Sequence, residues 1–155
     1  MKIGICDTMF ARADMGSIAE KTIKGYATEK IEIVRETVPG IKDLPVACKK
    51  LIEEKNCDIV LAFGMVGKEE IDQMCAHEAS QGLIQAQLMT NTHILGVFIH
   101  ENEAKNDDEL KEIMRHRTTE HAKNAVDMLL APQKIRENAG RAKRQGSKDA
   151  ISFEL

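Results

Sequence analysis

The sequence predicts an α/β fold in which a parallel sheet of four strands is flanked by helices on both faces, in three layers. Two observations carry this prediction: four short apolar runs alternate with four segments of helical length, and the connections between them are short. Such alternation is typical of parallel sheets, because each crossover helix packs back onto the sheet in the right-handed sense. With 155 residues, 43% of them apolar, the chain is long enough for one compact domain.

The strands are expected where apolar residues follow one another with few interruptions, which is typical of strands covered on both faces. They span residues 2–6, 31–34, 57–63 and 93–99. The helices are expected at residues 15–27, 43–55, 69–89 and 107–130. Asp14 is suited to cap the first helix, Pro45 fits the first turn of the second, and Pro132 ends or bends the fourth.

The chain after Pro132 is basic and poor in apolar residues. Residues 1–131 are therefore expected to form the α/β unit, and residues 132–155 a C-terminal helix and basic tail of the same domain. A solvated helix with a loose end is the simpler interpretation of the tail. Docking of the segment around Phe153 on a neighbour is the alternative.

The composition narrows the class of partner and the compartment. A formal charge of −3, from 22 Lys and Arg against 25 Asp and Glu, gives no extended field, so neither nucleic acid nor a membrane is expected as a partner. The start of the chain runs straight into a strand pattern without a signal-peptide region, which favours the cytoplasm. The four cysteines form no CxxC pair and lie in or beside apolar segments, so reduced thiols are expected rather than disulfides or zinc.

The turns that follow the strands carry the candidate chemistry, because ligands of parallel sheets bind beyond the carboxyl ends of the strands. Thr8, Met9 and Phe10 follow the first strand. The Phe10 ring is suited to stack on a planar heterocycle, a contact worth about 1 to 3 kcal/mol by analogy with bases on aromatic side chains. Burial of this ring under its own loop is an equally compatible interpretation.

The second and third turns are rich in glycine and supply backbone groups. The second contains Pro39, Gly40, Ile41, Lys42 and Asp43, and the third Gly64, Met65, Val66, Gly67 and Lys68. Pro-Gly predicts a tight turn with backbone N–H groups free for a ligand. The third turn opens a helix, where backbone amides meet polar ring edges or anions. Neither turn has the Walker A or GxGxxG pattern of nucleotide sites.

Proton transfer is assigned to the end of the fourth strand. His100 and Glu101 follow that strand, and a histidine moves protons near neutral pH. In the last helix, His116 and Arg117 form either a solvated face or an anchor for an electron-rich ligand at a subunit boundary. No metal ligands are assigned, because His77-Glu78 lacks the second histidine of HExxH.

Taken as a series, these segments resemble the lumazine synthase family over residues 2 to about 130. The resemblance rests on the order and spacing of residues 8–10, 38–40, 64–67, 76–86, 95–98, 101–102 and 122–128. It implies a lumazine-synthase-like, flavodoxin-like fold. Lumazine synthases carry a proton-transferring histidine four residues beyond the last glycine of the third turn, and that position here is Ile71. The Arg115 to Arg117 segment also lacks the Gly-Thr-Lys context of their phosphate site.

These departures make the chain more similar to archaeal-type riboflavin synthases. That resemblance implies dismutation of two molecules of 6,7-dimethyl-8-ribityllumazine into riboflavin and 5-amino-6-(ribitylamino)pyrimidine-2,4-dione. It also implies a magnesium requirement, no organic cofactor, and a homopentamer with sites between subunits. Phe10 is expected to stack on one ring, the Pro39 to Asp43 turn to hold the ribityl chain and pyrimidine edge, and the Met65 to Lys68 turn to bound the second ring. The alternatives are a lumazine synthase and a non-catalytic module that binds lumazine or flavin.

Overall fold

A computed structural model describes residues 1–154 as a sheet of four strands with helices on both faces, as predicted. In chain order the strands and α-helices are β1 (Lys2–Thr8), α1 (Met15–Tyr26), β2 (Glu32–Val38), α2 (Leu44–Glu53), β3 (Ile59–Val66), α3 (Glu70–Thr90), β4 (Ile94–His100), α4 (Asp107–Leu130) and α5 (Pro132–Glu137). Two short 3-10 turns, η1 (Ile41–Asp43) and η2 (Glu101–Glu103), follow β2 and β4. Leu155, the last residue of the predicted tail, lies outside the described residues.

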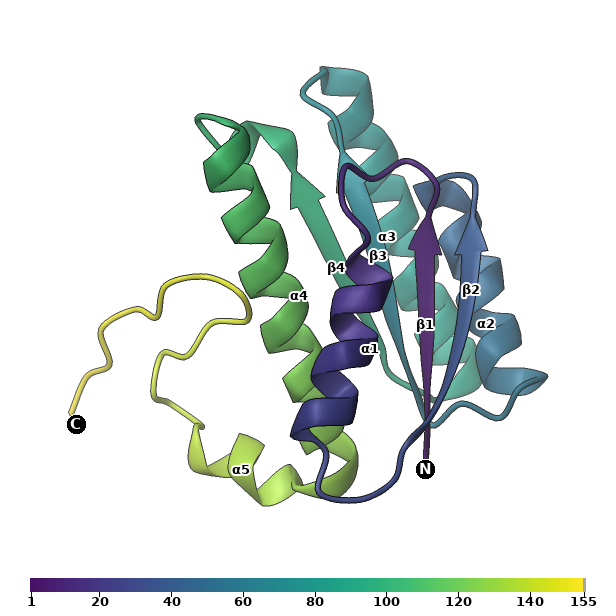
Figure 1. Cartoon of the computed structure of the whole chain (residues 1–155), viewed down its shortest axis with the longest axis vertical. Helices are drawn as coiled ribbons and strands as arrows, with labels where there is room; N and C mark the ends of the chain where they lie inside the picture. The colour runs from purple at the N-terminus through teal and green to yellow at the C-terminus, as the bar shows by residue number, and fades with distance from the viewer. Residues whose placement is uncertain (155) are drawn as a thin grey trace.

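The sheet has the order β2-β1-β3-β4, and every neighbouring pair is parallel. All carboxyl ends of the strands therefore lie at one edge, at the top of Figure 1. We call this the carboxyl edge. It is the edge at which the sequence places the site.

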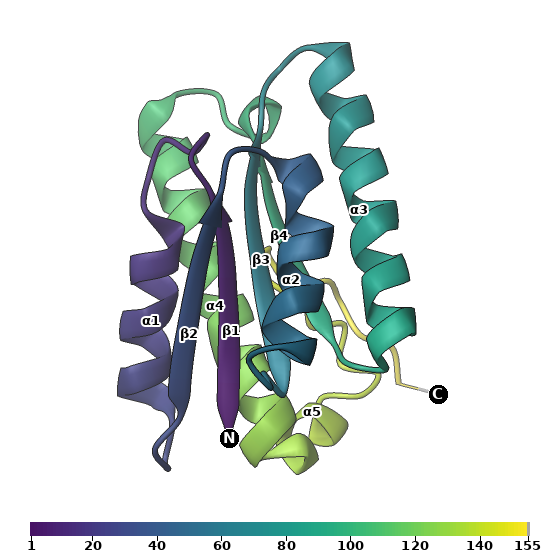
Figure 2. The same cartoon turned by 90° about the vertical axis from the view of Figure 1, so that its right-hand side faces the viewer.

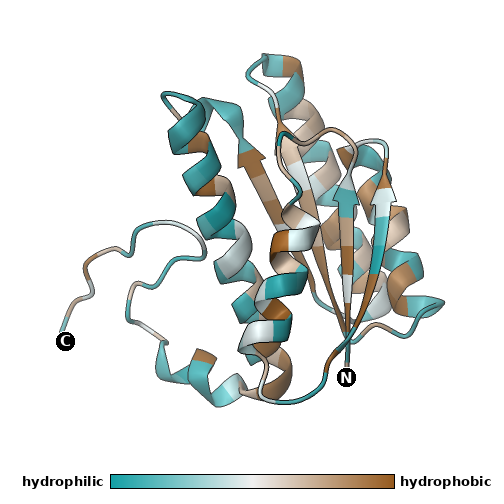
Figure 3. Cartoon of the chain, in the orientation of Figure 1, coloured by the Kyte–Doolittle hydropathy of each residue, from teal (hydrophilic) through white to brown (hydrophobic). Residues whose placement is uncertain are grey.

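Two helices cover each face of the sheet. Figure 2 shows α1 and α4 on one side and α2 and α3 on the other. The core on the α1/α4 side is built on Ile5, Phe63 and Met114, and the core on the α2/α3 side on Leu44 and Leu83. Strands coloured as hydrophobic run through the middle of Figure 3, and the end of β1 turns hydrophilic at the carboxyl edge.

The four strands differ in how deeply they are buried. Every residue of β3 is buried, and so are all residues of β1 after Lys2. The outer strands β2 and β4 are only partly buried, because each has a neighbouring strand on one side alone. β4 still packs against α3 on one face and α4 on the other.

The third strand also ends later than predicted. Gly64, Met65 and Val66 belong to β3 and not to the turn that follows it, since they pair with Phe98, Ile99 and His100 of β4. Of the predicted turn, only Gly67 and Lys68 lie in the connection to α3. The sequence suggested an earlier turn because Gly64 looks like a turn residue. Its glycine is explained by packing, because a Cβ there would lie 2.7 Å from Ile41 Cγ2 and 2.9 Å from Phe98 Cε1.

The thiols are free, as the sequence predicts. Cys6, Cys48 and Cys57 are buried in the α2/α3 core, and Cys75 is partly exposed. A hydrogen bond with Cys6, together with burial, raises the pKa of the Cys48 thiol, so this group stays neutral. None of the helices described in residues 1–154 is long and apolar enough to cross a membrane.

Helix α1 begins over a buried ion pair. Asp14 caps the helix as predicted, because its carboxylate accepts a hydrogen bond of 2.9 Å from the backbone N–H of Ser17. Next to the start of this helix, Arg35 Nε of β2 donates to Asp7 Oδ2 of β1 over 3.0 Å. A Cβ at Gly16 would lie 2.3 Å from that carboxylate oxygen, so only glycine lets α1 pack on the pair.

We therefore expect Gly16→Ala to destabilise the protein by roughly 2 kcal/mol, because disruption of a buried ion pair outweighs the helix-propensity gain of about 1 kcal/mol. Gly25→Ala in the same helix is the matched control, since no heavy atom lies within 4 Å of its new Cβ. It should stabilise by a few tenths to 1 kcal/mol. Denaturant unfolding of both variants measures the difference, and equal stabilisation by both substitutions would contradict the packing argument.

Candidate functional site

The loops at the carboxyl edge are tied to one another by hydrogen bonds between successive strands. The backbone N–H of Met9 donates to the Val38 carbonyl over 2.9 Å and joins the end of β1 to the end of β2. The backbone N–H of Arg12 lies 3.2 Å from Met65 Sδ and joins the β1 loop to the end of β3. The structure thus brings the first three predicted turns to one edge of the sheet.

Apolar side chains are exposed at this edge. Met9 and Phe10 of the β1 loop are 75% and 60% exposed, whereas Thr8 at the end of the strand is buried. Ile71 and Met74 in the first turns of α3 are 61% and 54% exposed. The Phe10 ring is therefore not buried under its own loop. Exposed apolar groups gathered around strand ends are typical of a binding surface.

The turn after β2 uses its own polar groups internally. The Gly40 N–H, which the sequence suggested as free for a ligand, donates to Asp43 Oδ2 over 3.1 Å and caps the η1 turn. Pro39, Lys42 and Asp43 are exposed, while Ile41 packs against Gly64. This turn therefore offers the exposed side chains, and not the Gly40 amide, to a ligand.

The turn after β3 also uses a backbone N–H group internally. The backbone N–H of Glu69 donates to Asp72 Oδ2 over 3.1 Å, so a carboxylate of the chain occupies part of the α3 N-terminus. Gly67 is partly buried and Lys68 is exposed. Gly64, Met65 and Val66 are buried in β3, and within the predicted set only Gly67 and Lys68 present atoms in a loop.

His100 at the end of β4 is held by a glutamine that the sequence analysis did not single out. Its Nδ1 lies 2.7 Å from Gln73 Oε1, and Gln73 Nε2 donates to the Gly67 carbonyl over 2.8 Å. Gln73 thereby connects the turn after β3 to the end of β4. The only sequence signal was its position in the first turns of the helix that leaves the glycine-bounded turn.

Glu101 is tied to the β1 loop. Arg12 Nη1 lies 3.5 Å from Glu101 Oε1, and Arg12 Nη2 donates to Asp107 Oδ2 over 2.7 Å. The Glu101 side chain is 18% exposed, which makes it the more shielded of the two carboxylates that Arg12 contacts. The His100 and Glu101 pair thus lies beside the loop that carries Phe10.

Arg117 is engaged within its own chain. Its guanidinium forms two hydrogen bonds with Glu103, of 2.7 and 3.0 Å, and donates to the Phe98 carbonyl over 3.0 Å. Burial favours the neutral acid of Glu103, but the hydrogen bonds from Arg117 and from the His100 N–H hold the pKa of that carboxyl below its usual value. Arg117 therefore holds η2, through Glu103, against the end of β4.

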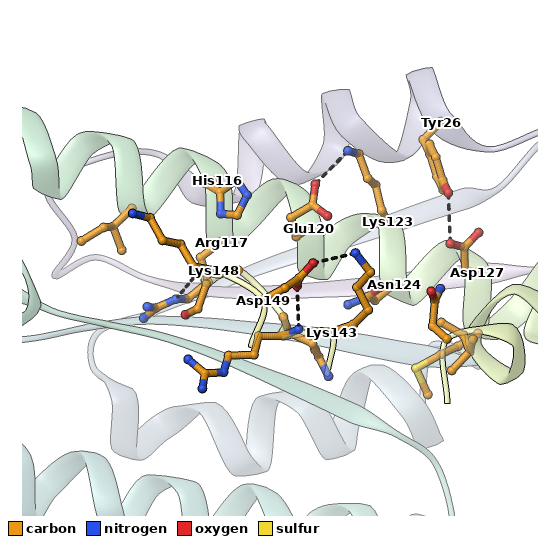
Figure 4. Close-up of a pocket in the computed structure, with 18 of the residues that line it drawn as sticks. Tyr26, His116, Arg117, Glu120, Lys123, Asn124, Asp127, Lys143, Lys148 and Asp149 are labelled. Atoms are coloured by element: carbon orange, nitrogen blue, oxygen red, sulfur yellow. Dashed lines mark hydrogen bonds and ion pairs between the residues drawn. The ribbon is translucent and has the colours of Figure 1, made fainter. Parts of the chain in front are cut away.

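His116 lines a hollow of about 1140 Å³ between α4 and residues 138–149, which Arg117 and Glu103 also line (Figure 4). An ion pair of 2.6 Å between Lys143 Nζ and Asp149 Oδ2 joins two parts of the tail that lines this hollow. Gly146 is buried against the Arg117 side chain. His116 thus lines this hollow, whereas His100 and Glu101 do not.

A second polar cluster was missed by sequence reasoning. Asp7, Arg35 and Thr37 line a small cavity of about 200 Å³ under Thr8 and Met9. Thr37 Oγ1 donates to Asp7 Oδ1 over 2.6 Å, so the carboxylate is already saturated by the chain. The available signal was that Asp7 and Arg35 each directly follow an apolar run expected to be a strand. Within residues 1–154 no three His, Cys, Asp or Glu side chains are grouped to hold a metal ion.

His121 on α4 is buried with no hydrogen bond to Nδ1 among the described residues. Burial, reinforced by the positive charge of Arg117, lowers the pKa of His121 to about 4. The folded protein therefore keeps this ring neutral at pH values where the unfolded chain, with a pKa near 6.5, already binds a proton.

The free energy of unfolding should consequently fall as the pH drops from about 6.5 to about 4, and we expect His121 to contribute roughly 3 kcal/mol to that loss. His121→Leu removes this contribution. The gap in stability between the variant and the parent should widen in favour of the variant from pH 7.5 to pH 4.5, as measured by urea unfolding. A gap that does not depend on pH would show that the ring is not held neutral.

The sequence is similar to known proteins over almost its whole length. The 6,7-dimethyl-8-ribityllumazine synthase family model matches residues 1–133. The chain is 58% identical over 149 residues to the riboflavin synthase of Methanothermobacter marburgensis, covering 96% of this chain and 97% of that protein. It is 47% identical to the riboflavin synthase of Archaeoglobus fulgidus, over 96% of each chain. The 6,7-dimethyl-8-ribityllumazine synthase of Thermococcus onnurineus is 29% identical over 71% of this chain and 72% of its own length.

Proposed function

The chain belongs to the 6,7-dimethyl-8-ribityllumazine synthase family, and we propose that within this family it acts as a riboflavin synthase of the archaeal type. The observation that carries the proposal is its similarity to archaeal riboflavin synthases over almost the whole length of both chains. The reaction is the dismutation of two 6,7-dimethyl-8-ribityllumazine molecules into riboflavin and 5-amino-6-(ribitylamino)pyrimidine-2,4-dione.

Two observations favour this activity over lumazine synthesis. The similarity to lumazine synthases is lower and covers less of the chain. In addition, the position at which the sequence comparison expects the proton-transferring histidine of lumazine synthases carries Ile71, an exposed apolar side chain in the first turn of α3. An apolar side chain at this point suits a flat heterocycle better than it suits proton transfer to a four-carbon ketone phosphate.

The chemistry requires a surface for planar rings and a base. The C7 methyl group of one lumazine is acidic because its anion delocalises into the ring, and the anion must meet the second ring. Holding two rings together supplies up to about 7 to 11 kcal/mol of a barrier in favourable intramolecular reactions. Phe10 and Met9 supply exposed apolar surface at the carboxyl edge, and His100 and Glu101 supply groups that accept and return a proton.

The remaining predicted residues take supporting roles in this proposal. Pro39, Lys42 and Asp43 offer exposed atoms for the ribityl chain and the pyrimidine edge, and Gly67 with Lys68 bounds the second ring. Arg117 acts by fixing η2, because its guanidinium is already bound to Glu103. In this proposal His116 acts from a neighbouring subunit, with the hollow that it lines beside α4 facing the site of that subunit.

We propose a homopentamer with sites between adjacent subunits, as the family resemblance implies. The exposed apolar side chains of α3 support contact with another copy. Ile84 and Leu88 lie one turn apart on this helix, and Leu88 is 78% exposed. Neighbouring exposed apolar side chains on one helix are typical of a protein–protein contact surface.

Magnesium and the cytoplasm remain predictions. Residues 1–154 do not group three His, Cys, Asp or Glu side chains, so the described part of one chain provides no carboxylate cage for magnesium. Activity of chelator-treated protein with and without added magnesium tests the requirement.

Purified protein incubated with 6,7-dimethyl-8-ribityllumazine and magnesium, without added reductant, should convert two lumazines into one riboflavin and one pyrimidinedione. Riboflavin fluorescence and chromatography of both products measure the conversion. Binding of lumazine without turnover would identify a binding module instead. Formation of lumazine from the aminopyrimidine and the four-carbon ketone phosphate would identify a lumazine synthase.

Loss of the aromatic ring at Phe10 should weaken substrate binding. Stacking contributes about 1 to 3 kcal/mol, so we expect Phe10→Leu to raise KM roughly tenfold or more. Phe10→Tyr is the matched control, because it keeps the ring in the same exposed position and should leave KM close to that of the parent. Steady-state kinetics of both variants measure KM. Equal KM values for Phe10→Leu and Phe10→Tyr would show that the aromatic ring does not bind substrate.

A further inference from the structure

The hydrogen bonds of Gln73 fix how the ring of His100 is protonated. The Gly67 carbonyl is an acceptor only, so the group of Gln73 that lies 2.8 Å from it must be the NH₂ group. The amide oxygen of Gln73 is then the atom that lies 2.7 Å from His100 Nδ1. The orientation of the amide is thereby set by the backbone and not by the histidine.

An amide oxygen facing Nδ1 selects one form of the neutral imidazole. A carbonyl oxygen only accepts, so Nδ1 must carry the proton, and Nε2 then holds the free lone pair. The opposite tautomer would place two lone pairs against each other at 2.7 Å. Among the described residues, Nε2 has no hydrogen-bond partner, and it is the atom left to take a proton.

We propose that Gln73 is a positioning residue that makes His100 a proton carrier acting through Nε2 alone. This inference rests on the proposed function for its catalytic meaning, but the tautomer itself is a property of the free protein. When Nε2 takes a proton from the C7 methyl group, the methyl C–H bond breaks and its electron pair stays in the lumazine ring. The Nδ1–H bond to Gln73 persists in the charged ring, so no rearrangement accompanies the transfer.

The rest of the local structure supports this arrangement. The backbone N–H of His100 donates to Glu103 Oε2 over 3.2 Å, and Glu103 is held by Arg117. Backbone and ring of His100 are therefore fixed from two sides, by η2 and by α3. A triad in which a third group orients the histidine follows the same logic, since a wrong tautomer removes the base without removing the imidazole.

The test uses two substitutions at Gln73 in the full-length protein. Gln73→Met keeps the length of the side chain but removes both the donor and the acceptor, so Nδ1 loses its partner. Gln73→Glu keeps an oxygen that accepts from Nδ1–H. Gln133→Met, at an exposed glutamine of α5, is the control for the exchange of glutamine to methionine.

The first measurement is the tautomer of His100, from solid-state ¹⁵N spectra of histidine-labelled protein at about pH 8.5, where an ordinary imidazole is neutral. The spectrum of a His100→Gln variant identifies which of the five histidines is His100. We expect the Nδ1–H form in the parent, in Gln73→Glu and in Gln133→Met, and its loss in Gln73→Met. An Nε2–H ring in the parent, or an unchanged ring in Gln73→Met, would overturn the assignment.

The second measurement is riboflavin formation. We expect kcat of Gln73→Met to fall roughly 10- to 100-fold with little change in KM, because a base is lost and the ring surface is retained. Gln73→Glu should recover most of that loss. A changed tautomer with an unchanged kcat would refute the role of His100 as the base. A parent protein that makes no riboflavin would refute the proposed function, while the spectra would still decide the tautomer.

Discussion

Complete burial of β3 is the constraint on which the rest of the structure depends. This strand lies in the middle of the sheet with β1 and β4 beside it, and helices cover both of its faces. Its carboxyl end is packed so tightly that a Cβ at Gly64 would meet both Ile41 and Phe98. The turn after β2 and the end of β4 are thus fixed against one strand, and the loops of the carboxyl edge cannot shift independently.

The polar groups of this edge mostly satisfy one another. Asp43 caps the turn after β2, Asp72 caps α3, and Arg117 binds Glu103. These contacts satisfy backbone N–H groups of the turns and the guanidinium of Arg117, so they stabilise the loops before any ligand arrives. The edge presents apolar surface outward through Met9 and Phe10, and exposed charged side chains through Lys42, Asp43 and Lys68. A surface of this kind suits a planar heterocycle that carries a polar side chain.

Proton transfer in such a site depends on a few groups with fixed orientation. His100 ends β4 and Glu101 follows it, but the two are held by different partners, Gln73 on one side and Arg12 on the other. The two partners come from α3 and from the β1 loop, so the geometry of the pair depends on three segments far apart in the chain. Preorganisation of this sort lowers the reorganisation needed during the reaction.

The sequence by itself determined the alternation of strands and helices, the parallel sheet and the edge at which the site lies, because apolar periodicity and capping residues such as Asp14 are local signals. The sequence also indicated the family, through the order and spacing of many short segments. It placed Gly64 to Val66 in a turn, because the close packing that requires glycine within β3 comes from two other segments.

Only the tertiary structure decided the partners of the site residues. It showed that the Gly40 amide is occupied, that Arg117 is paired within its chain, and that Gln73 orients His100. Gln73 and His100 are separated by 27 residues, and no periodicity in the sequence signals a hydrogen bond across that distance. Such contacts depend on how α3 packs beside β4, which is a property of the folded sheet and not of either segment alone.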